Sequence, residues 1–392
     1  MIFILLFFSG NSLSSFLFGK FDSLYLLISI LIIYKSKIIK KNIFYYTYIK
    51  VALFLIVLFL FQLYELGFVS WLGVLNFLLK IFIGGLLISY LGERFYIYLF
   101  EVLYYLCFIS LVFFFLINIL GVSLPNIAIG EELNSYIIYS TNLRHFSRNT
   151  GMFGEPGFFG CIITLCLALN FNNLQFYFKN YPLKVIIIVL ALITCQSTGS
   201  YISFFFIVIF YAISFKKRSA LFIFLPALIV LIFIYSKTDF LSEKVETQYS
   251  AASEQKIGEL SNTRFGSLVF DWHYIQKHPF IGNGIHEKTR YADHQYLFFG
   301  SEGKSVIGSG NGFSNYLASM GVFFIFGYFF LLYKSFNING KFYAFIIVVI
   351  VFLNLQVEQW FNFPIYLGLP FFGLFKKYDK KLSFKTKRSQ AV

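Results

Sequence analysis

The chain has little charge, and its cysteines form no cluster. Only 13% of its 392 residues are charged and 58% are hydrophobic, a balance outside the range of soluble globular domains. The four cysteines lie in apolar stretches without a CxxC pair, which is typical of small buried hydrophobes and not of disulfides or metal ligands. Residues 1–5 carry no charge and no cleavage site follows them, so we expect a first span there and not a signal peptide.

Histidine is scarce as well, and it follows no metal-binding pattern. Four of the five histidines, His273, His278, His286 and His294, fall in one polar interval. Their spacing matches no zinc signature such as HExxH. We therefore predict no metal site and no other cofactor.

Long apolar runs make up most of the chain. Runs of about 20 apolar residues match a bilayer core of about 30 Å. We predict an all-α polytopic integral membrane protein, one membrane domain over residues 1–392 with about twelve transmembrane helices. The expected spans are residues 2–18, 21–34, 43–64, 68–91, 95–120, 156–174, 183–196, 200–215, 219–236, 312–333, 342–357 and 360–375. The spans 183–196 and 200–215 are short, which predicts a break near 196–200 that is buried in protein or faces a wet cavity.

The net charge of +14 is best explained by membrane topology. Lysine and arginine follow alternate predicted spans and end in the basic tail 376–392. This positive-inside pattern predicts that both termini lie in the cytoplasm, in what would be a bacterial inner membrane, and it argues against nucleic-acid binding. The opposite, periplasmic side then receives two long loops, residues 122–155 and 237–311.

The larger loop, 237–311, is the main polar interval of the chain. It holds 9 of the 18 acidic residues, 8 of the 32 basic residues and 4 of the 5 histidines. This mixed charge predicts a folded, partly helical cap outside the membrane. An amphipathic helix near the membrane surface is indicated by the spacing of Phe265, Leu268, Val269, Trp272 and Ile275. His278-Pro279 would end that helix, and the glycines at 282 and 284 would form a tight turn.

The smaller loop, 122–155, ends in a cluster of charge directly before a span. It contains Arg144, Arg148 and Glu155, and Pro156 suits the first turn of the following helix. Glu155 would then lie beside a helix N-terminus, where negative charge is stabilised. Two interpretations stay open, because these residues either cap a helix and meet lipid headgroups or belong to a functional site.

Two charged residues interrupt the apolar spans. Lys80 lies near the middle of span 68–91, where a lysine indicates a functional site unless its side chain snorkels to the surface or the span is misplaced. Glu358 lies near the outer end of the last hairpin and could line a cavity.

Three motifs, in order along the chain, resemble those of one superfamily. The segment from Arg148 to Pro156 is similar to the "R..G.F.EP" segment of bacterial O-antigen polymerases and ligases. Arg264, Trp272 and the run HPFIGNG from His278 resemble the "R…W…HPLFGVG" segment of the same superfamily. Ser309-Gly310-Asn311-Gly312-Phe313 opens the next span as a third match. Ligases carry His-Asn where this chain has Gly310-Asn311. They also commonly carry Ser-Arg after the seventh span, where this chain has Gln196-Ser197-Thr198-Gly199, so the resemblance favours the polymerase (Wzy type).

The resemblance implies a metal-independent glycosyltransferase with a C-type glycosyltransferase-like architecture. It would transfer a growing glycan chain from undecaprenyl pyrophosphate to a new lipid-linked repeat unit, building O-antigen or capsule. The alternatives are an O-antigen ligase that acts on lipid A core and a lipid-linked oligosaccharide flippase or transporter. Undecaprenyl-pyrophosphate-linked oligosaccharides, membrane lipid and a chain-length regulator are the expected partners.

Arginine matches phosphate oxygens bidentately, which suggests roles for individual residues at a pyrophosphate. We expect Arg264 and Arg148 to hold the leaving group, and Glu155, His294 or His278 to act as the base. The expected substrate-binding residues are Arg144, Arg290, Asn311, Trp272 and Lys80.

Overall fold

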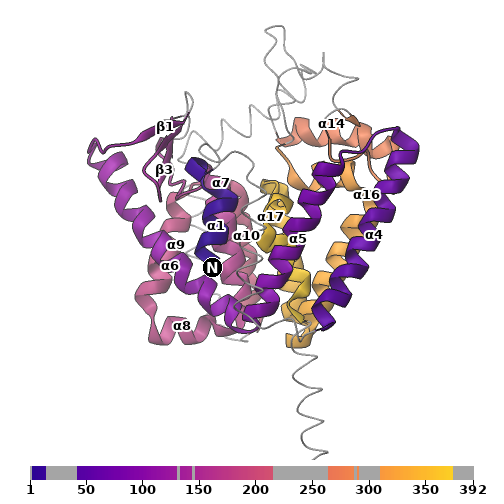
Figure 1. Cartoon of the computed structure of the whole chain (residues 1–392). Helices are drawn as coiled ribbons and strands as arrows, with labels where there is room; N and C mark the ends of the chain where they lie inside the picture. Colours follow the sequence, from indigo (N-terminus) through magenta and orange to yellow (C-terminus); the bar gives the residue numbers. More distant parts are fainter. Residues whose placement is uncertain are drawn as a thin grey trace, which may run out of the picture.

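A computed structural model of the chain describes residues 2–14, 42–129, 133–143, 146–214, 264–286, 289–290 and 310–373 (Figure 1). The predicted spans 21–34 and 219–236 and the basic tail 376–392 lie outside these residues. The described helices are α1 (Ile2–Gly10), α4 (Asn42–Leu66), α5 (Trp71–Leu91), α6 (Arg94–Phe114), α7 (Pro156–Leu169), α8 (Leu174–Asn180), α9 (Pro182–Thr194), α10 (Thr198–Ser214), α14 (Arg264–Lys277), α16 (Gly312–Phe336), α17 (Lys341–Val357) and α18 (Pro364–Gly368).

The helices confirm a helical membrane protein. Among the described residues, four helices are long and apolar enough to cross a membrane, or five if the bent pair Pro156–Leu169 and Phe171–Asn180 forms one span. The two halves of that pair are bent by 66°. The total of about twelve spans and their orientation stay predictions.

The helix α7 forms the centre of the bundle. Nearly all of its side chains are buried, and it packs against α6, α10 and α17. A single fully buried amide joins α7, α10, α17 and α18, because Asn354 of α17 donates to the Cys161 carbonyl (3.0 Å) and to Tyr366 Oη (2.9 Å). Its Oδ1 accepts from Thr164 of α7 (3.2 Å) and Ser203 of α10 (3.0 Å). All four hydrogen-bonding positions of the amide are therefore used within the apolar core.

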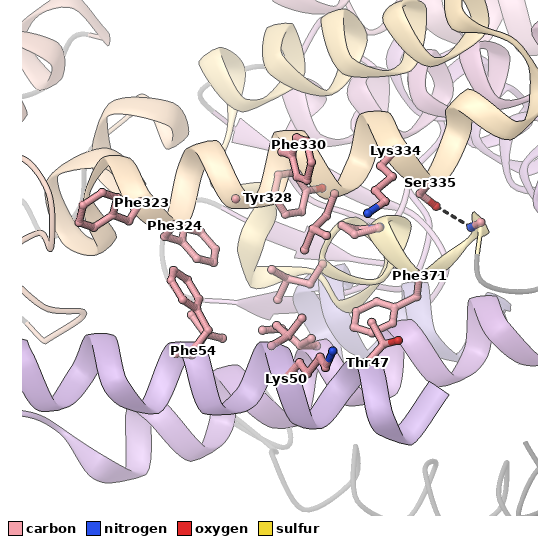
Figure 2. A pocket seen from close by; sticks show the side chains of 18 residues that line it. Thr47, Lys50, Phe54, Phe323, Phe324, Tyr328, Phe330, Lys334, Ser335 and Phe371 are labelled. Carbon is pink, nitrogen blue, oxygen red and sulfur yellow. Dashed lines mark hydrogen bonds between the residues drawn. The ribbon is translucent and has the colours of Figure 1, made fainter. Parts of the chain in front are cut away.

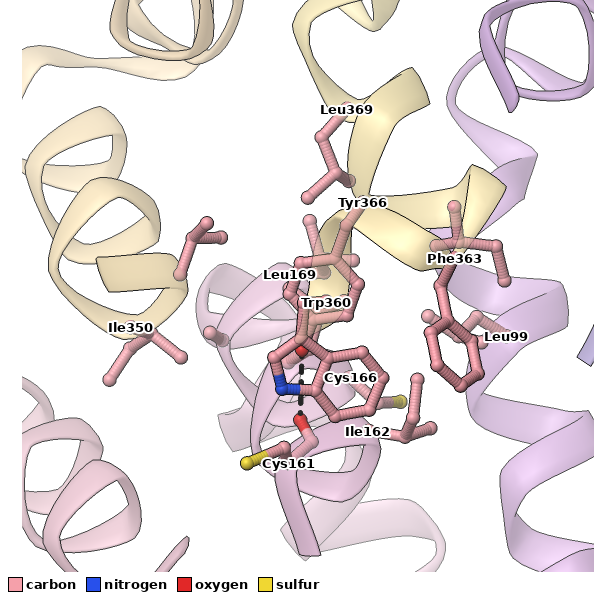
Figure 3. Close-up of a cluster of buried hydrophobic side chains, with 14 of the residues drawn as sticks. Leu99, Cys161, Ile162, Cys166, Leu169, Ile350, Trp360, Phe363, Tyr366 and Leu369 are labelled. Carbon is pink, nitrogen blue, oxygen red and sulfur yellow. Dashed lines mark hydrogen bonds between the residues drawn. The ribbon is translucent and has the colours of Figure 1, made fainter. Parts of the chain in front are cut away.

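The expected last span, 360–375, is not a continuous helix, and that prediction was wrong. Over residues 360–373 the structure has short 3₁₀ turns, Trp360–Asn362 and Leu369–Phe371, on either side of the five-residue helix α18. Pro364 and Pro370 lack the N–H that a continuous helix needs. The segment is buried instead, with the rings of Trp360 and Tyr366 stacked 4.4 Å apart beside α7 (Figure 3).

The helix α16 is kinked, and the HPFIGNG turn fills the kink. Gly321 has φ 73° and ψ 176°, which breaks the helical hydrogen bonds around it. The freed N–H of Val322 donates to the Pro279 carbonyl (2.9 Å), and the freed carbonyl of Ser319 accepts from the backbone N–H at position 284 (2.9 Å). Gly282, with φ 75°, lies so close that a β-carbon there would overlap the Ser319 backbone. The predicted tight turn is confirmed, and its role in the fold is to complete α16.

A small antiparallel sheet precedes α7 and was not predicted. Its strands are β1 (Ile127–Ile129), β2 (Leu133–Ser135) and β3 (Ser140–Asn142), with Ile127 opposite Ser135 and Leu133 opposite Asn142. Ser140 N donates to the Gly151 carbonyl (2.7 Å), which fixes the chain just before α7. Figure 1 shows the sheet and α14 at one end of the bundle and α8 at the other.

Candidate functional site

Three of the described helices begin around the end of α17. They are α7, α10 and α16, and each has a glycine in its first turn: Gly157, Gly199 and Gly312. A β-carbon at Gly157 would lie 2.5 Å from Oε1 of Glu358, and one at Gly312 would overlap the Glu358 carbonyl. A β-carbon at Gly199 would overlap the side chain of the neighbouring Val357. The glycines therefore allow three helix N-termini to converge on Val357 and Glu358, with the Glu358 carboxylate against the first turn of α7.

This convergence concentrates positive potential at one point. A helix N-terminus carries about half a positive charge and presents unpaired backbone N–H groups. The C-terminus of α17 offsets one of the three N-termini, so an excess of positive charge remains. The acids that meet it are Glu358, which is half-buried, and Glu155 at the N-cap of α7. Such an arrangement stabilises negative charge, whether that of the carboxylate or of a bound anion.

Asn311 joins the beginning of α16 to the end of α17. Its Oδ1 accepts from Ser314 N (3.1 Å), which makes it the N-cap of α16. Its Nδ2 donates to Oε1 of Gln356 (2.9 Å) in the last turn of α17. Both polar ends of the amide are therefore used to hold the two helix ends together.

The segment 264–290 contributes an acid and a base to the same turn of α16. The fully buried Asp271 of α14 accepts from Ser314 Oγ (2.6 Å) through Oδ2. Arg290, also buried, donates through Nη1 to Oδ1 (2.5 Å) and to the carbonyl (3.2 Å) of Asn315. The segment is thus fixed to the N-terminal turn of α16 by charged side chains.

Arg148 lies at the break between α9 and α10. Its Nε donates to the Cys195 carbonyl (3.2 Å) and its Nη2 to the Gln196 carbonyl (2.7 Å), and the side chain is buried. Gln196 has φ 48°, so the break predicted near 196–200 is confirmed, within protein. The guanidinium satisfies the carbonyls of the two residues that follow α9 and places a positive charge just before α10 begins.

Glu155 occupies the N-cap position of α7, with Pro156 in the first turn as predicted. Its side chain makes no capping hydrogen bond. Gly157, whose close approach to Glu358 was described above, follows two residues later in the first turn. Glu155 and Glu358 are therefore carboxylates at the same end of α7.

Other predicted site residues lie elsewhere. The helix predicted around residues 265–275 is confirmed as α14, but Trp272 is 54% exposed on its outer face, while Asp271, Tyr274 and Ile275 are buried. His278 follows α14, and its carbonyl accepts from the backbone N–H at position 282 (2.8 Å). Lys80 is half-buried in the middle of α5.

Three of the predicted residues cannot be placed. Arg144 and His294 lie outside the described residues, and of Arg264 only the backbone, at the beginning of α14, is described. Their expected contacts with a substrate stay predictions.

Several residues around the end of α17 had no role predicted from the sequence, among them Gln356, Ser314 and Asn315. For Glu358 the sequence predicted only a position near the outer end of the last hairpin. The signal that could have found the group is the repeated glycine in the first turn of α7, α10 and α16. A glycine there marks a close approach of another chain segment. The partner segment, however, is set by the packing of α17 and is not readable from spacing.

A comparison with protein families agrees with the resemblance in the second and third motifs. A family model named Wzy_C, described as O-Antigen ligase, matches residues 183–329, from α9 into α16. Over this segment the chain is similar to O-antigen ligases, which supports a place in the O-antigen polymerase/ligase superfamily, whose members are glycosyltransferase-like enzymes. No curated protein and no solved structure matches the chain.

Proposed function

We propose that the protein polymerises lipid-linked oligosaccharide repeat units into a surface polysaccharide. The growing chain moves from undecaprenyl pyrophosphate to a sugar hydroxyl of a new lipid-linked unit. The observation that carries the proposal is the convergence of α7, α10 and α16 on Glu358, at the same end of the bundle as the buried Arg148 and Arg290. The family match over residues 183–329 supports the same reaction class.

The leaving group explains why such a site suits this reaction. The bond between the anomeric carbon and the pyrophosphate oxygen breaks, and its electron pair leaves with the pyrophosphate. Helix N-termini and arginines stabilise the charge that develops there. Arg264 stays the first candidate for direct phosphate contact, because the two donor groups of Arg148 described above already bind carbonyls.

The acceptor hydroxyl must lose a proton as it attacks the anomeric carbon. We assign this proton to the carboxylate of Glu358, which lies against the first turn of α7. Glu155, at the N-cap of the same helix, is the second candidate. A positioned base of this kind contributes about 10²–10⁴-fold to a rate.

The residue at position 310 favours chain growth over transfer to lipid A core. The ligases that resemble this segment carry a histidine where this chain has Gly310, whose N–H donates to Ser267 Oγ (2.9 Å). With glycine there, position 310 supplies no side-chain base. A transporter would be expected to carry polar groups along its spans, whereas Arg148, Arg290 and Glu358 gather at one end of the bundle.

Deleting the gene in cells distinguishes a polymerase from a ligase and from a flippase. We expect surface glycan with one repeat unit on its acceptor, read as loss of the ladder on a gel. Glycan that is missing from the acceptor while long lipid-linked chains accumulate would indicate a ligase. Lipid-linked units that stay on the inner face of the membrane would indicate a flippase.

A further inference from the structure

A groove between α4 and α16 runs from the kink of α16 toward the end of the bundle away from the candidate site. Its volume is about 580 Å³, within the range of small-molecule sites. Gln62 of α4 meets the kink by donating to the Ser319 carbonyl (2.9 Å). Lys50 lies about 18 Å along α4 from that contact, and Lys334 about 22 Å along α16, at a rise of about 1.5 Å per residue. The two lysines therefore lie at one level, far from Glu358.

The lining of the groove is polar at one end and apolar at the other. The polar side chains are Thr47, Lys50, Lys334 and Ser335. The apolar part includes Phe54, Phe323 and Phe324 and extends toward the kink (Figure 2). Figure 2 shows both lysine ammonium groups directed into the space between the helices. This is the pattern of a site for an amphipathic ligand with a negatively charged head.

Neither lysine forms an ion pair with a carboxylate among the described residues. Lys50 Nζ lies 4.3 Å from the Tyr46 ring centroid, and Lys334 Nζ lies 5.7 Å from that of Phe330. These contacts hold the ammonium groups at the groove without neutralising them.

We propose that this groove binds an anionic phospholipid, with its headgroup on Lys50 and Lys334 and an acyl chain along Phe54 and Phe323. An uncharged polyprenol would fill the apolar part but leave two ammonium groups without a counter-charge from the part of the chain that the structure describes. A phospholipid headgroup supplies that charge at the level where the lysines lie. The site is separate from the proposed glycan transfer and does not depend on it.

The test is lipid retention by the full-length purified protein, measured by native mass spectrometry. Phosphatidylglycerol and phosphatidylcholine with the same acyl chains are the probes. We expect the Lys50→Gln/Lys334→Gln variant to bind phosphatidylglycerol about 25-fold less tightly, or about fivefold per lysine, with phosphatidylcholine unchanged. The matched control is Lys179→Gln/Lys341→Gln, which removes the same charge from exposed positions outside the groove.

A second variant tests the apolar part. A β-carbon at Gly327 meets nothing within 4 Å, so Gly327→Phe should fold and fill the groove, and lipid retention should fall for both probes. Equal loss in the control pair would overturn the proposal in favour of general surface charge. Displacement of phosphatidylglycerol by uncharged polyprenol, with no effect of the lysine changes, would overturn it in favour of a polyprenyl groove. Retention of undecaprenyl phosphate in preference to phosphatidylglycerol would overturn it in favour of a carrier-lipid site.

Discussion

The position of Glu358 is set by the helices around it. The first turns of α16 and of α7 both contact it through glycines, so its position is fixed by two helices at once. A carboxylate held against helix N-termini is stabilised as an anion, which is the protonation state that a general base needs.

Arg148 has a structural role that its sequence position did not reveal. Its motif predicted a phosphate ligand, whereas the structure shows it bound to the carbonyls of Cys195 and Gln196. Local sequence could not reveal this, because the carbonyls become available only where α9 ends. The role at pyrophosphate stays a prediction beside the structural one.

Replacing Arg148 should therefore destabilise the fold. Arg148→Ala leaves two backbone carbonyls without their donor, so we expect a loss of about 3 kcal/mol in the free energy of unfolding. Chemical denaturation of the purified protein in detergent measures it. Arg94→Ala, at an exposed arginine, is the control and should change stability by less than about 0.5 kcal/mol. Unchanged stability in Arg148→Ala would show that the carbonyl contacts are not structural.

At the scale of elements, small residues decide which helix ends meet. The sequence predicted α4, α5, α6, α16 and α17 well, because each is a long apolar run. It failed for residues 360–373, where prolines interrupt an equally apolar run. It also failed for the sheet before α7, whose three-residue strands carry too short a pattern to read.

Two glycines of α16 give a matched test of the convergence. Gly312→Ala would push a methyl group into the Glu358 carbonyl, and we expect a loss of about 1–3 kcal/mol in stability. Gly327→Ala meets open space and should stabilise the helix by up to about 1 kcal/mol. Melting temperatures of the two variants compare them directly. Similar behaviour of both would contradict the close packing at Glu358.

At the scale of the whole molecule, the two ends of the bundle carry different charged groups. The end with Glu358, Arg148 and Arg290 carries the groups suited to a pyrophosphate leaving group. The opposite end carries an ion pair of Glu101 with Lys184 (2.6 Å) and the lysines of the groove. The predicted division into a periplasmic and a cytoplasmic side stays a prediction.

The most direct test is chain lengthening by purified protein in lipid vesicles, supplied with an undecaprenyl-pyrophosphate-linked repeat unit. We predict a ladder of products and released undecaprenyl pyrophosphate for the natural protein and for Glu101→Gln, whose ion pair lies at the far end. Glu358→Gln should fold normally and lengthen chains at least about 100-fold more slowly. A normal ladder from Glu358→Gln would contradict the assignment of Glu358 as the base.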